Sequence, residues 1–265
     1  MDSDPQLCHI SSLPVELLAE IMRMSSDVVI LPFGRFPWNV ASVSRHWRSI
    51  ALSHPQLWNA IFIQPSPNLF SLNADITRFI PVLELVLKRA GESRLTFTMP
   101  EQLPTPQYGE ILAVFCIRAE FWLYACVSVD RHIVHVLDRV RGRLNSLEDA
   151  SITSFLTKGM QCKALKEAPR LTSLSIFGLP ETIQLPKDQI LRVELMATSN
   201  HPYDLLRLFP RVQRIDIKDS SFCLPLDGSH ITLPSLQFLA LSSLDLGFTF
   251  SNLTLPALNT VKLME

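Results

Sequence analysis

The chain is poor in charged residues and in glycine. Charged side chains make up 18% of its 265 residues, and the formal net charge is −1. No basic stripe stands out along the sequence, which argues against electrostatic capture of nucleic acid. The sequence has 8 glycines against 19 prolines. The prolines recur beside apolar runs, a pattern that is typical of short elements separated by repeated breaks.

Cysteine is also sparse, and the sequence shows no secretory signal. The five cysteines are scattered, odd in number and without close pairs, which favours reduced thiols in an intracellular protein of the cytoplasm, the nucleus or both. The N-terminus is acidic and lacks the basic and apolar regions of a signal peptide. The apolar stretch 111–129 contains Arg118 and Glu120, which would be costly in lipid. We therefore expect a buried helix followed by a strand there, and no membrane partner.

Recognisable catalytic and nucleotide-binding motifs are absent as well. The sequence has no G-x-S-x-G elbow and no glycine-rich phosphate loop. His132 and His135, with Asp130 and Asp138, have helical spacing, but a metal site needs three or more convergent ligands, and such a surface is far more often simply solvated. We therefore expect a protein that is not an enzyme, with no catalytic residue, no cofactor and no metal. An enzyme is the weakest of the functions considered.

A repeated apolar pattern is what the sequence does contain. Apolar residues at positions one, four and six recur, and the repeats begin at Trp122, Leu147, Leu171, Ile190, Val212, Leu236 and Leu258. These starting residues are 25, 24, 19, 22, 24 and 22 apart, within the period of leucine-rich repeats, about 20–29 residues with an L-x-x-L-x-L core. Positions four and six should point from parallel strands into one shared core. Leu174, Val193, Ile215 and Leu239 should therefore all be buried.

Two further strands and several crossover segments fit the same scheme. Leu57, Ala60 and Phe62 match the template, and Leu95, Phe97 and Met99 alternate as in a strand. Apolar stripes at helical spacing occur at 75–90, 133–140 and 205–209, and we expect helical crossovers there. The later crossovers contain a repeated LTLPxL-like sequence and are expected to be irregular. The asparagine that usually follows each strand of a leucine-rich repeat is missing, and Gly178 is one of the residues in its place.

The N-terminal segment from Leu13 to Trp58 carries two apolar stripes. Pro14, Leu17, Leu18 and Ile21 recur at helical spacing, and Pro14 suits the first turn of a helix. A second helix is predicted from Val40, Val43, Trp47 and Ile50, and Pro55 should end it. Short helices cannot bury so much apolar surface alone, so they need the rest of the chain, a partner, or both.

These residues also carry a family resemblance. LPVELLAEI, followed by VSRHWRSIA and PQLW, resembles an F-box, in particular the F-box-like proteins with leucine-rich tails of mushroom-forming fungi. The resemblance implies docking on the Skp adaptor of a Skp–cullin–F-box ubiquitin ligase. The positions that match the adaptor-binding motif are Leu13, Pro14, Glu16, Leu17, Ile21, Val43, Arg45 and Trp47. The sequence departs from the family at Ser44, where cysteine is usual, and in its long loop 24–37.

The expected architecture is therefore α+β. A small helical F-box module over 1–62 would precede an irregular leucine-rich-repeat solenoid over 63–265, with parallel strands and helical or irregular crossovers. No polar cap follows the last repeat, so we expect either a solenoid that is truncated at its C-terminus or a final strand with an exposed edge. Its concave strand face is the candidate surface for an unknown target protein. The residues expected to bind the target are Phe177, Arg192, Glu194, Met196, Arg214, Asp216 and Lys218. Parallel stacking predicts Arg192 beside Arg214 and Glu194 beside Asp216, and a partner could offset the repulsion between these like charges.

Two functions follow from this organisation. In the first, the protein is a non-catalytic substrate receptor that binds the Skp adaptor, and through it a cullin, while the solenoid presents a target for ubiquitin transfer. In the second, the solenoid is a protein-interaction scaffold that works without a ligase, and the N-terminal stripes simply pack as core. Co-purification of the adaptor distinguishes the two.

Overall fold

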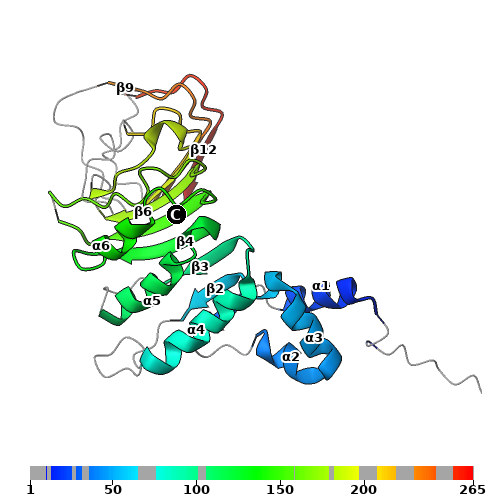
Figure 1. Cartoon of the computed structure of the whole chain (residues 1–265). Helices are drawn as coiled ribbons and strands as arrows, with labels where there is room; N and C mark the ends of the chain where they lie inside the picture. Colours follow the sequence, from blue (N-terminus) through cyan, green and yellow to red (C-terminus); the bar gives the residue numbers. More distant parts are fainter. Residues whose placement is uncertain are drawn as a thin grey trace, which may run out of the picture. The chain divides into compact units, whose positions relative to one another are not determined.

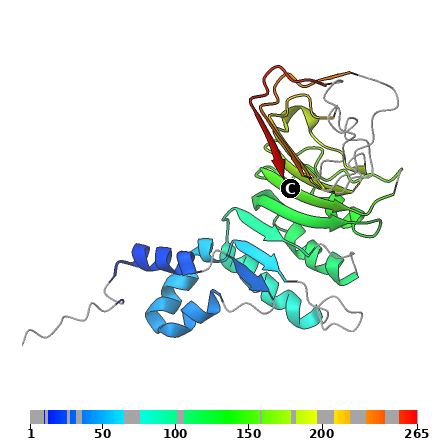
Figure 2. The same cartoon turned by 180° about the vertical axis from the view of Figure 1, so that it is seen from behind.

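The structure is a computed structural model with two compact units. The first unit contains Met1–Gln64 and Asp75–Phe97, and the second contains Pro65–Ala74 and Thr98–Glu265. Helices and strands are mixed in both, as Figures 1 and 2 show from opposite sides. The residues that the structure describes are 10, 13–25, 28–31, 36–64, 76–100, 106–157, 159–178, 182–196, 208–218, 230–242 and 253–264.

The first unit begins with a module of three helices. Helix α1 (Val15–Ser25) packs against α3 (Arg45–Ser53), and α2 (Trp38–Val43) packs against α3 as well. The buried apolar side chains of the module are Leu18, Met22, Val40, Ile50 and Ala51. Pro55 starts a short 3-10 helix, η2 (Pro55–Leu57), in agreement with its expected role in ending the helix before it.

The single second helix expected from the apolar period is wrong, because the chain breaks into α2 and α3 at Ser44. Ser44 has an extended backbone, with φ −157° and ψ 170°, and its hydroxyl accepts a hydrogen bond from the backbone N–H of Trp47. This is an N-cap, which satisfies a donor that the first turn of α3 would otherwise leave without a partner. The helical period continues across the break, so the spacing alone does not show it.

Trp58 joins the remaining parts of the first unit. Its ring lies edge-to-face on Trp38 with centroids 5.4 Å apart, and its indole N–H donates to the carbonyl of Ala51 at 2.7 Å. The guanidinium of Arg89, from helix α4 (Ile76–Ala90), lies 4.4 Å from the centre of the same ring. Trp58 is fully buried, so it connects α2, α3 and α4. The expected helix at 75–90 is thereby confirmed.

The strands of the first unit are β1 (Val29–Leu31), β2 (Ala60–Ile63) and β3 (Leu95–Thr98), in that order. Strand β1 lies within the long loop and pairs parallel to β2. The template match at Leu57, Ala60 and Phe62 is wrong by one residue, since Ile61 and Ile63 are the buried side chains of β2. The alternation predicted at Leu95, Phe97 and Met99 is confirmed, because all three are buried.

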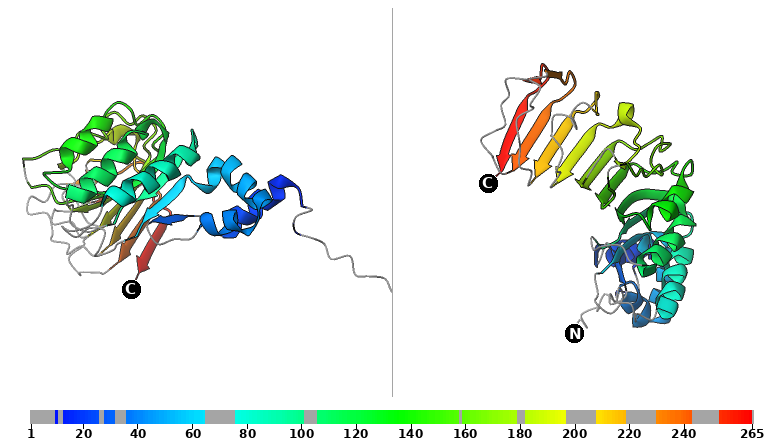
Figure 3. Two further views of the ribbon diagram at one scale, coloured as in Figure 1. Left: turned by 60° about the horizontal axis from the view of Figure 1, so that its bottom comes forward. Right: turned by 90° about the vertical axis from the view of Figure 1, so that its left-hand side faces the viewer.

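In the second unit, seven strands of the described part lie side by side in chain order, and every neighbouring pair is parallel. Figure 3 shows this succession from green to red. The strands are β4 (Trp122–Val129), β5 (Asp149–Ser154), β6 (Ser173–Gly178), β7 (Arg192–Met196), β8 (Arg214–Lys218), β10 (Phe238–Ser242) and β12 (Thr260–Met264). They coincide with the seven template matches, so the predicted parallel sheet is confirmed.

The core of the second unit lies on one face of these strands. Leu174, Val193, Ile215 and Leu239 are all buried, as predicted. The last strand, β12, is the exception. Its Val261 and Leu263 continue the inward rows but are 49% and 56% exposed.

Helices cover part of this core. Helix α5 (Pro106–Cys116) precedes β4, which confirms the helix and strand expected over 111–129. Helix α6 (Val134–Leu137) is short and continues as the 3-10 turn η4 (Asp138–Val140). The apolar stripe 133–140 is nevertheless buried as expected. Of the third predicted crossover helix, Leu205 and Leu206 lie outside the described residues. No helix in the described part of the chain is long and apolar enough to cross a membrane.

The repeated LTLPxL-like segments form a second, smaller sheet. Strands β9 (Ile231–Thr232) and β11 (Leu253–Thr254) pair in parallel, and the N–H of Leu233 donates to the carbonyl of Thr254 at 3.0 Å. In another crossover, the side chain of Gln189 donates hydrogen bonds to the carbonyls of Ala168 and Leu171. The described parts of these crossovers are thus irregular, as expected, and contain hydrogen bonds between neighbouring repeats.

Candidate protein-interaction surfaces

Helix α1 buries one apolar side and exposes another. Leu18 and Met22 are buried, whereas Leu17 is 52% and Ile21 is 41% exposed. Pro14 and Glu16 are exposed as well, and Leu13 is half-buried. The predicted adaptor-binding residues of this segment are thus largely available at the surface. We call Leu17, Ile21 and Val43, which is 61% exposed at the end of α2, the exposed apolar residues of the module.

The remaining residues of the adaptor-binding motif lie in the first turn of α3. Arg45 is exposed, and Trp47 is half-buried beside its hydrogen bond to the capping Ser44. Trp58, which ends the PQLW segment, lies in the core instead. The motif therefore combines surface positions with positions that build the module. Single-sequence spacing does not separate the two kinds.

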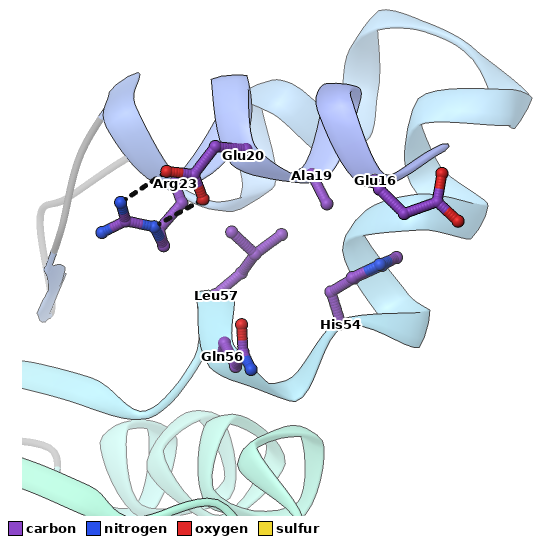
Figure 4. Close-up of a pocket in the computed structure, with 7 residues that line it drawn as sticks. All are labelled: Glu16, Ala19, Glu20, Arg23, His54, Gln56 and Leu57. Carbon is purple, nitrogen blue, oxygen red and sulfur yellow. Dashed lines mark hydrogen bonds and ion pairs between the residues drawn. The ribbon is translucent and has the colours of Figure 1, made fainter. Parts of the chain in front are cut away.

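A small polar pocket lies between α1 and the segment that follows α3 (Figure 4). It has a volume of about 210 Å³ and is lined by Glu16, Ala19, Glu20, Arg23, His54, Gln56 and Leu57. Arg23 makes two hydrogen bonds to the carboxylate of Glu20, which lower the pKa of that group. Glu16 is the one predicted adaptor-binding residue in this pocket, and Leu17 and Ile21 do not line it.

His132 and His135 of the second unit line an apolar groove between α5 and α6. Both are exposed, and with Pro106, Gly109, Glu110, Ala113, Ile133 and Val136 they surround a volume of about 650 Å³. Asp130 accepts hydrogen bonds from the backbone N–H groups of His132 and Ile133. Asp138 accepts one from the backbone N–H of Lys163. These carboxylates therefore order loops. Among the described residues, no group of three His, Cys, Asp or Glu could hold a metal ion.

The seven predicted target-binding residues do lie together on the second unit. They occupy the side of β6, β7 and β8 opposite the core, with Arg192 paired to Arg214, Glu194 to Asp216 and Met196 to Lys218 in the strand register. This is the predicted register. The same side of the neighbouring strands adds further residues. We call the whole surface the strand face: Tyr124, Asp149, Ser151, Thr153, Ser175, Phe177, Arg192, Glu194, Met196, Arg214, Asp216, Lys218 and Phe238.

Like charges lie side by side on this face as predicted, but most of them are also paired with opposite charges within the chain. Arg214 binds Asp216 with two hydrogen bonds, of 2.7 and 3.1 Å, and its guanidinium lies 4.0 Å from the centre of the Phe238 ring. Lys218 forms an ion pair with Glu194 at 2.5 Å. Ser175 donates a further hydrogen bond to Glu194 at 2.9 Å. These contacts offset the cost without any partner.

A depression of about 380 Å³ opens on the strand face next to these charges. Its lining mixes hydroxyl groups with apolar side chains: Tyr124, Ser151, Thr153, Phe155, Ser175, Ile176, Phe177, Glu194 and Met196. Phe177 is 40% exposed. The sequence analysis missed Tyr124, Ser151 and Thr153, although the same alternation along β4 and β5 would have placed them here. Phe155 follows the end of β5, where alternation no longer applies.

Two carboxylates of this face have pKa values that move in opposite directions. Burial raises the pKa of Asp149 above its usual value, although a hydrogen bond from Ser173 works against this. Burial acts in the same direction on Glu194, but its hydrogen bonds with Lys218 and Ser175 outweigh the effect, so the pKa of Glu194 falls below its usual value. Burial also raises the pKa of the Tyr124 phenol. Tyr124 therefore remains a neutral hydrogen-bonding group.

The comparisons with known proteins add no relative to this description. No family model matches the chain, and no curated protein is significantly similar to it.

Proposed function

We propose that the protein is a non-catalytic substrate receptor of a Skp–cullin–F-box type ubiquitin ligase. In this proposal the three-helix module is an F-box that binds the Skp adaptor. The second unit is an irregular leucine-rich-repeat solenoid whose strand face binds the target protein. The ubiquitin-transferring centre would then lie on another subunit, and no catalytic group is needed in this chain.

The exposure of these apolar residues of the module is the observation that carries the proposal. Leu17, Ile21 and Val43 are far more exposed than their neighbours Leu18 and Met22, and they coincide with the adaptor-binding motif of the family that the sequence resembles. Large apolar side chains cost free energy when they face water, and burying one is worth about 1.5–3 kcal/mol. Their exposure in the isolated chain is what a docking surface for another protein requires.

Affinity capture of the full chain, co-expressed with a Skp adaptor and a cullin, tests the proposal. The double variant Leu17→Glu with Ile21→Glu should lose the adaptor and, with it, the cullin. Two Leu-sized contacts contribute together about 3–6 kcal/mol, which corresponds to more than about a hundredfold in affinity. Replacing Leu13 and Pro14 with alanine should weaken capture in the same direction.

The matched control lies on α4 in the same unit. Val82 and Leu85 are each 40% exposed and lie outside the motif, so Val82→Glu with Leu85→Glu should retain the adaptor. Unchanged capture by the α1 variant would contradict the F-box assignment. The protein would then fit the second function, a scaffold that works through its strand face without a ligase.

A further inference from the structure

The positive charges of the strand face are neutralised unevenly. Arg214 and Lys218 each have a carboxylate partner, Asp216 and Glu194 respectively. Arg192 is exposed, and its side chain makes no hydrogen bond or ion pair with any residue in the described part of the chain. Its attraction to Asp149 acts without a direct contact. The hydrogen-bond donors of the Arg192 guanidinium are therefore available to a ligand.

Arg192 and Arg214 are neighbours in register on adjacent parallel strands. Adjacent strands lie about 4.8 Å apart, so these two long side chains leave the sheet from neighbouring positions on the same face. Arg214 is already held in place by its two hydrogen bonds to Asp216 and by the ring of Phe238, while its remaining N–H groups stay unused by these contacts. A fixed arginine beside an available one is a suitable site for an anion, since planar guanidinium groups bind carboxylates in paired hydrogen bonds.

The surrounding charges favour an anion with one negative charge. Three carboxylates balance the three cations Arg192, Arg214 and Lys218. Asp149 lies in the same register row as Arg192 and Arg214, and Glu194 and Asp216 are register partners two residues further along the strands. A phosphate with nearly two negative charges would be repelled by three nearby carboxylates. A carboxylate can bind between the two arginines at less electrostatic cost, and Asp and Glu side chains are the common source of such a group in proteins.

An apolar subsite lies at a defined distance from this pair. Met196 is four residues beyond Arg192 on β7 and lines the depression together with Phe177. Four residues of a strand span about 13 Å. Residues i and i+4 of an extended peptide are separated by the same length and face the same side. An extended segment can thus reach both places without bending.

We infer that the strand face binds an extended segment of the target protein that carries one Asp or Glu and, four residues away, one bulky apolar residue. The carboxylate lies between Arg192 and Arg214, and the apolar side chain enters the depression beside Phe177 and Met196. This inference rests on the proposed function for its choice of the strand face as the receptor surface, and it names the chemistry of the partner.

Selection of a random-peptide display library on the purified full chain tests this. The enriched peptides should share an acidic residue four positions from a Leu, Phe or Met, in either chain direction. Fluorescence anisotropy with one synthesised peptide should then show about tenfold or greater weakening when its acidic residue is changed to the amide. The variant Arg192→Gln should weaken the acidic peptide similarly, and it should not distinguish the acid from the amide.

Lys187→Gln is the matched control, because Lys187 is an exposed cation of η6 (Lys187–Gln189), outside the strand face, and its loss should leave peptide affinity unchanged. The inference is overturned if selection yields no peptide, if the selected peptides lack an acidic residue, or if Arg192→Gln binds them as tightly as the native chain. Tenfold tighter binding of a peptide with phosphoserine at the acidic position overturns the choice of a carboxylate. The Arg192→Gln variant should still capture the adaptor. If the native chain fails to capture the adaptor, that result contradicts only the proposed function.

Discussion

Gly178, at the end of β6, lies where the backbones of two strands leave no room for a side chain. Its φ is +102°, a conformation that side chains other than glycine rarely adopt. A Cβ atom there would collide with the carbonyl oxygen of Ser154, its register partner on β5. The strand pairing of β5 and β6 therefore depends on this glycine twice, through its backbone conformation and through its lack of a side chain.

The variants Gly178→Ala and Gly159→Ala separate these two effects. Gly159 also has a positive φ, of +96°, but no atom lies near the position of its Cβ. We expect each variant to lose about 1–2 kcal/mol from the backbone conformation. Gly178→Ala should lose a further 1–3 kcal/mol or so, because backbone must move to accept the methyl group. Chemical denaturation monitored by circular dichroism measures the difference, and equal losses would show that β5 and β6 can separate at low cost.

Asp149 and Glu194 should change the stability of the folded state in opposite directions as the pH falls. The pKa of Glu194 is lowered in the folded state, so its contribution to stability is present above its unfolded pKa and is lost as the pH falls through the folded pKa. The pKa of Asp149 is raised, so the folded state favours its protonated form and gains relative stability as the pH falls toward the unfolded pKa.

Thermal midpoints between neutral pH and about pH 4, near the usual carboxyl pKa values, test this pair. Glu194→Gln should make the loss of stability on acidification smaller than in the native chain. Asp149→Asn should make this loss larger, because the variant lacks the carboxylate whose protonation favours the folded state. Glu92→Gln provides a control, since Glu92 is an exposed carboxylate of the other unit. Parallel pH profiles for the first two variants would contradict the assigned directions.

At the scale of elements, the break between α2 and α3 depends on one hydroxyl. Ser44→Ala removes the acceptor for the N–H of Trp47 and should reduce stability by about 1 kcal/mol, as is usual for a lost N-cap. Ser42 offers a control, because its hydroxyl bonds to the carbonyl of Asn39 within α2 and caps no helix, so Ser42→Ala should change stability little. Tryptophan fluorescence reports mainly on the first unit, which contains Trp38, Trp47 and Trp58. Equal effects of the two variants would argue against the cap.

The elements with a strong period could be predicted from the sequence, and those without it could not. The seven strands of the second unit and helix α4 follow from regular apolar spacing. The prediction for β2 was wrong by one residue because Leu57 lies in a 3-10 turn. The number of residues between Leu57 and the inward positions of the strand therefore differs from that in the repeats. Strands β9 and β11 have two residues each, too few for any alternation to show.

The candidate site was predictable to the same extent. Alternation along parallel strands placed Arg192, Glu194 and Met196 on one face and set their neighbours on β8 correctly. The ion pairs could not be predicted, since long flexible side chains choose partners along the strand, as Arg214 does with Asp216, or diagonally, as Lys218 does with Glu194. In the first unit, the motif likewise did not show that Trp58 lies in the core.

At the scale of the whole molecule, we expect β12 to promote self-association of the second unit at high concentration. Val261 and Leu263 are about half exposed, whereas their register partners Leu239 and Leu241 on β10 are buried. An apolar strand edge can pair with another chain. The double variant Val261→Glu with Leu263→Lys, which keeps the net charge, should reduce self-association in light scattering and leave the thermal midpoint nearly unchanged.

The corresponding substitutions on β10 provide the comparison. Leu239→Glu with Leu241→Lys places two charges in the core, where unpaired charges are very costly, and the second unit should fail to fold cooperatively. If the β12 variant loses as much stability as the β10 variant, the last strand contributes to the core despite its exposure. If self-association is unchanged, another surface is responsible for it.

The strict chain order of the strands also determines how the second unit would respond to mechanical load. Within the large sheet, each strand lies beside the strand of that sheet that precedes it in the chain. A force that pulls the C-terminal end away from the sheet would therefore detach β12 first, then β10, then β8. Their template starts are 24 and 22 residues apart, so each detachment would lengthen the chain by about 75–85 Å at ~3.5 Å per residue. Extension under load would therefore proceed in near-equal steps, one for each strand that detaches.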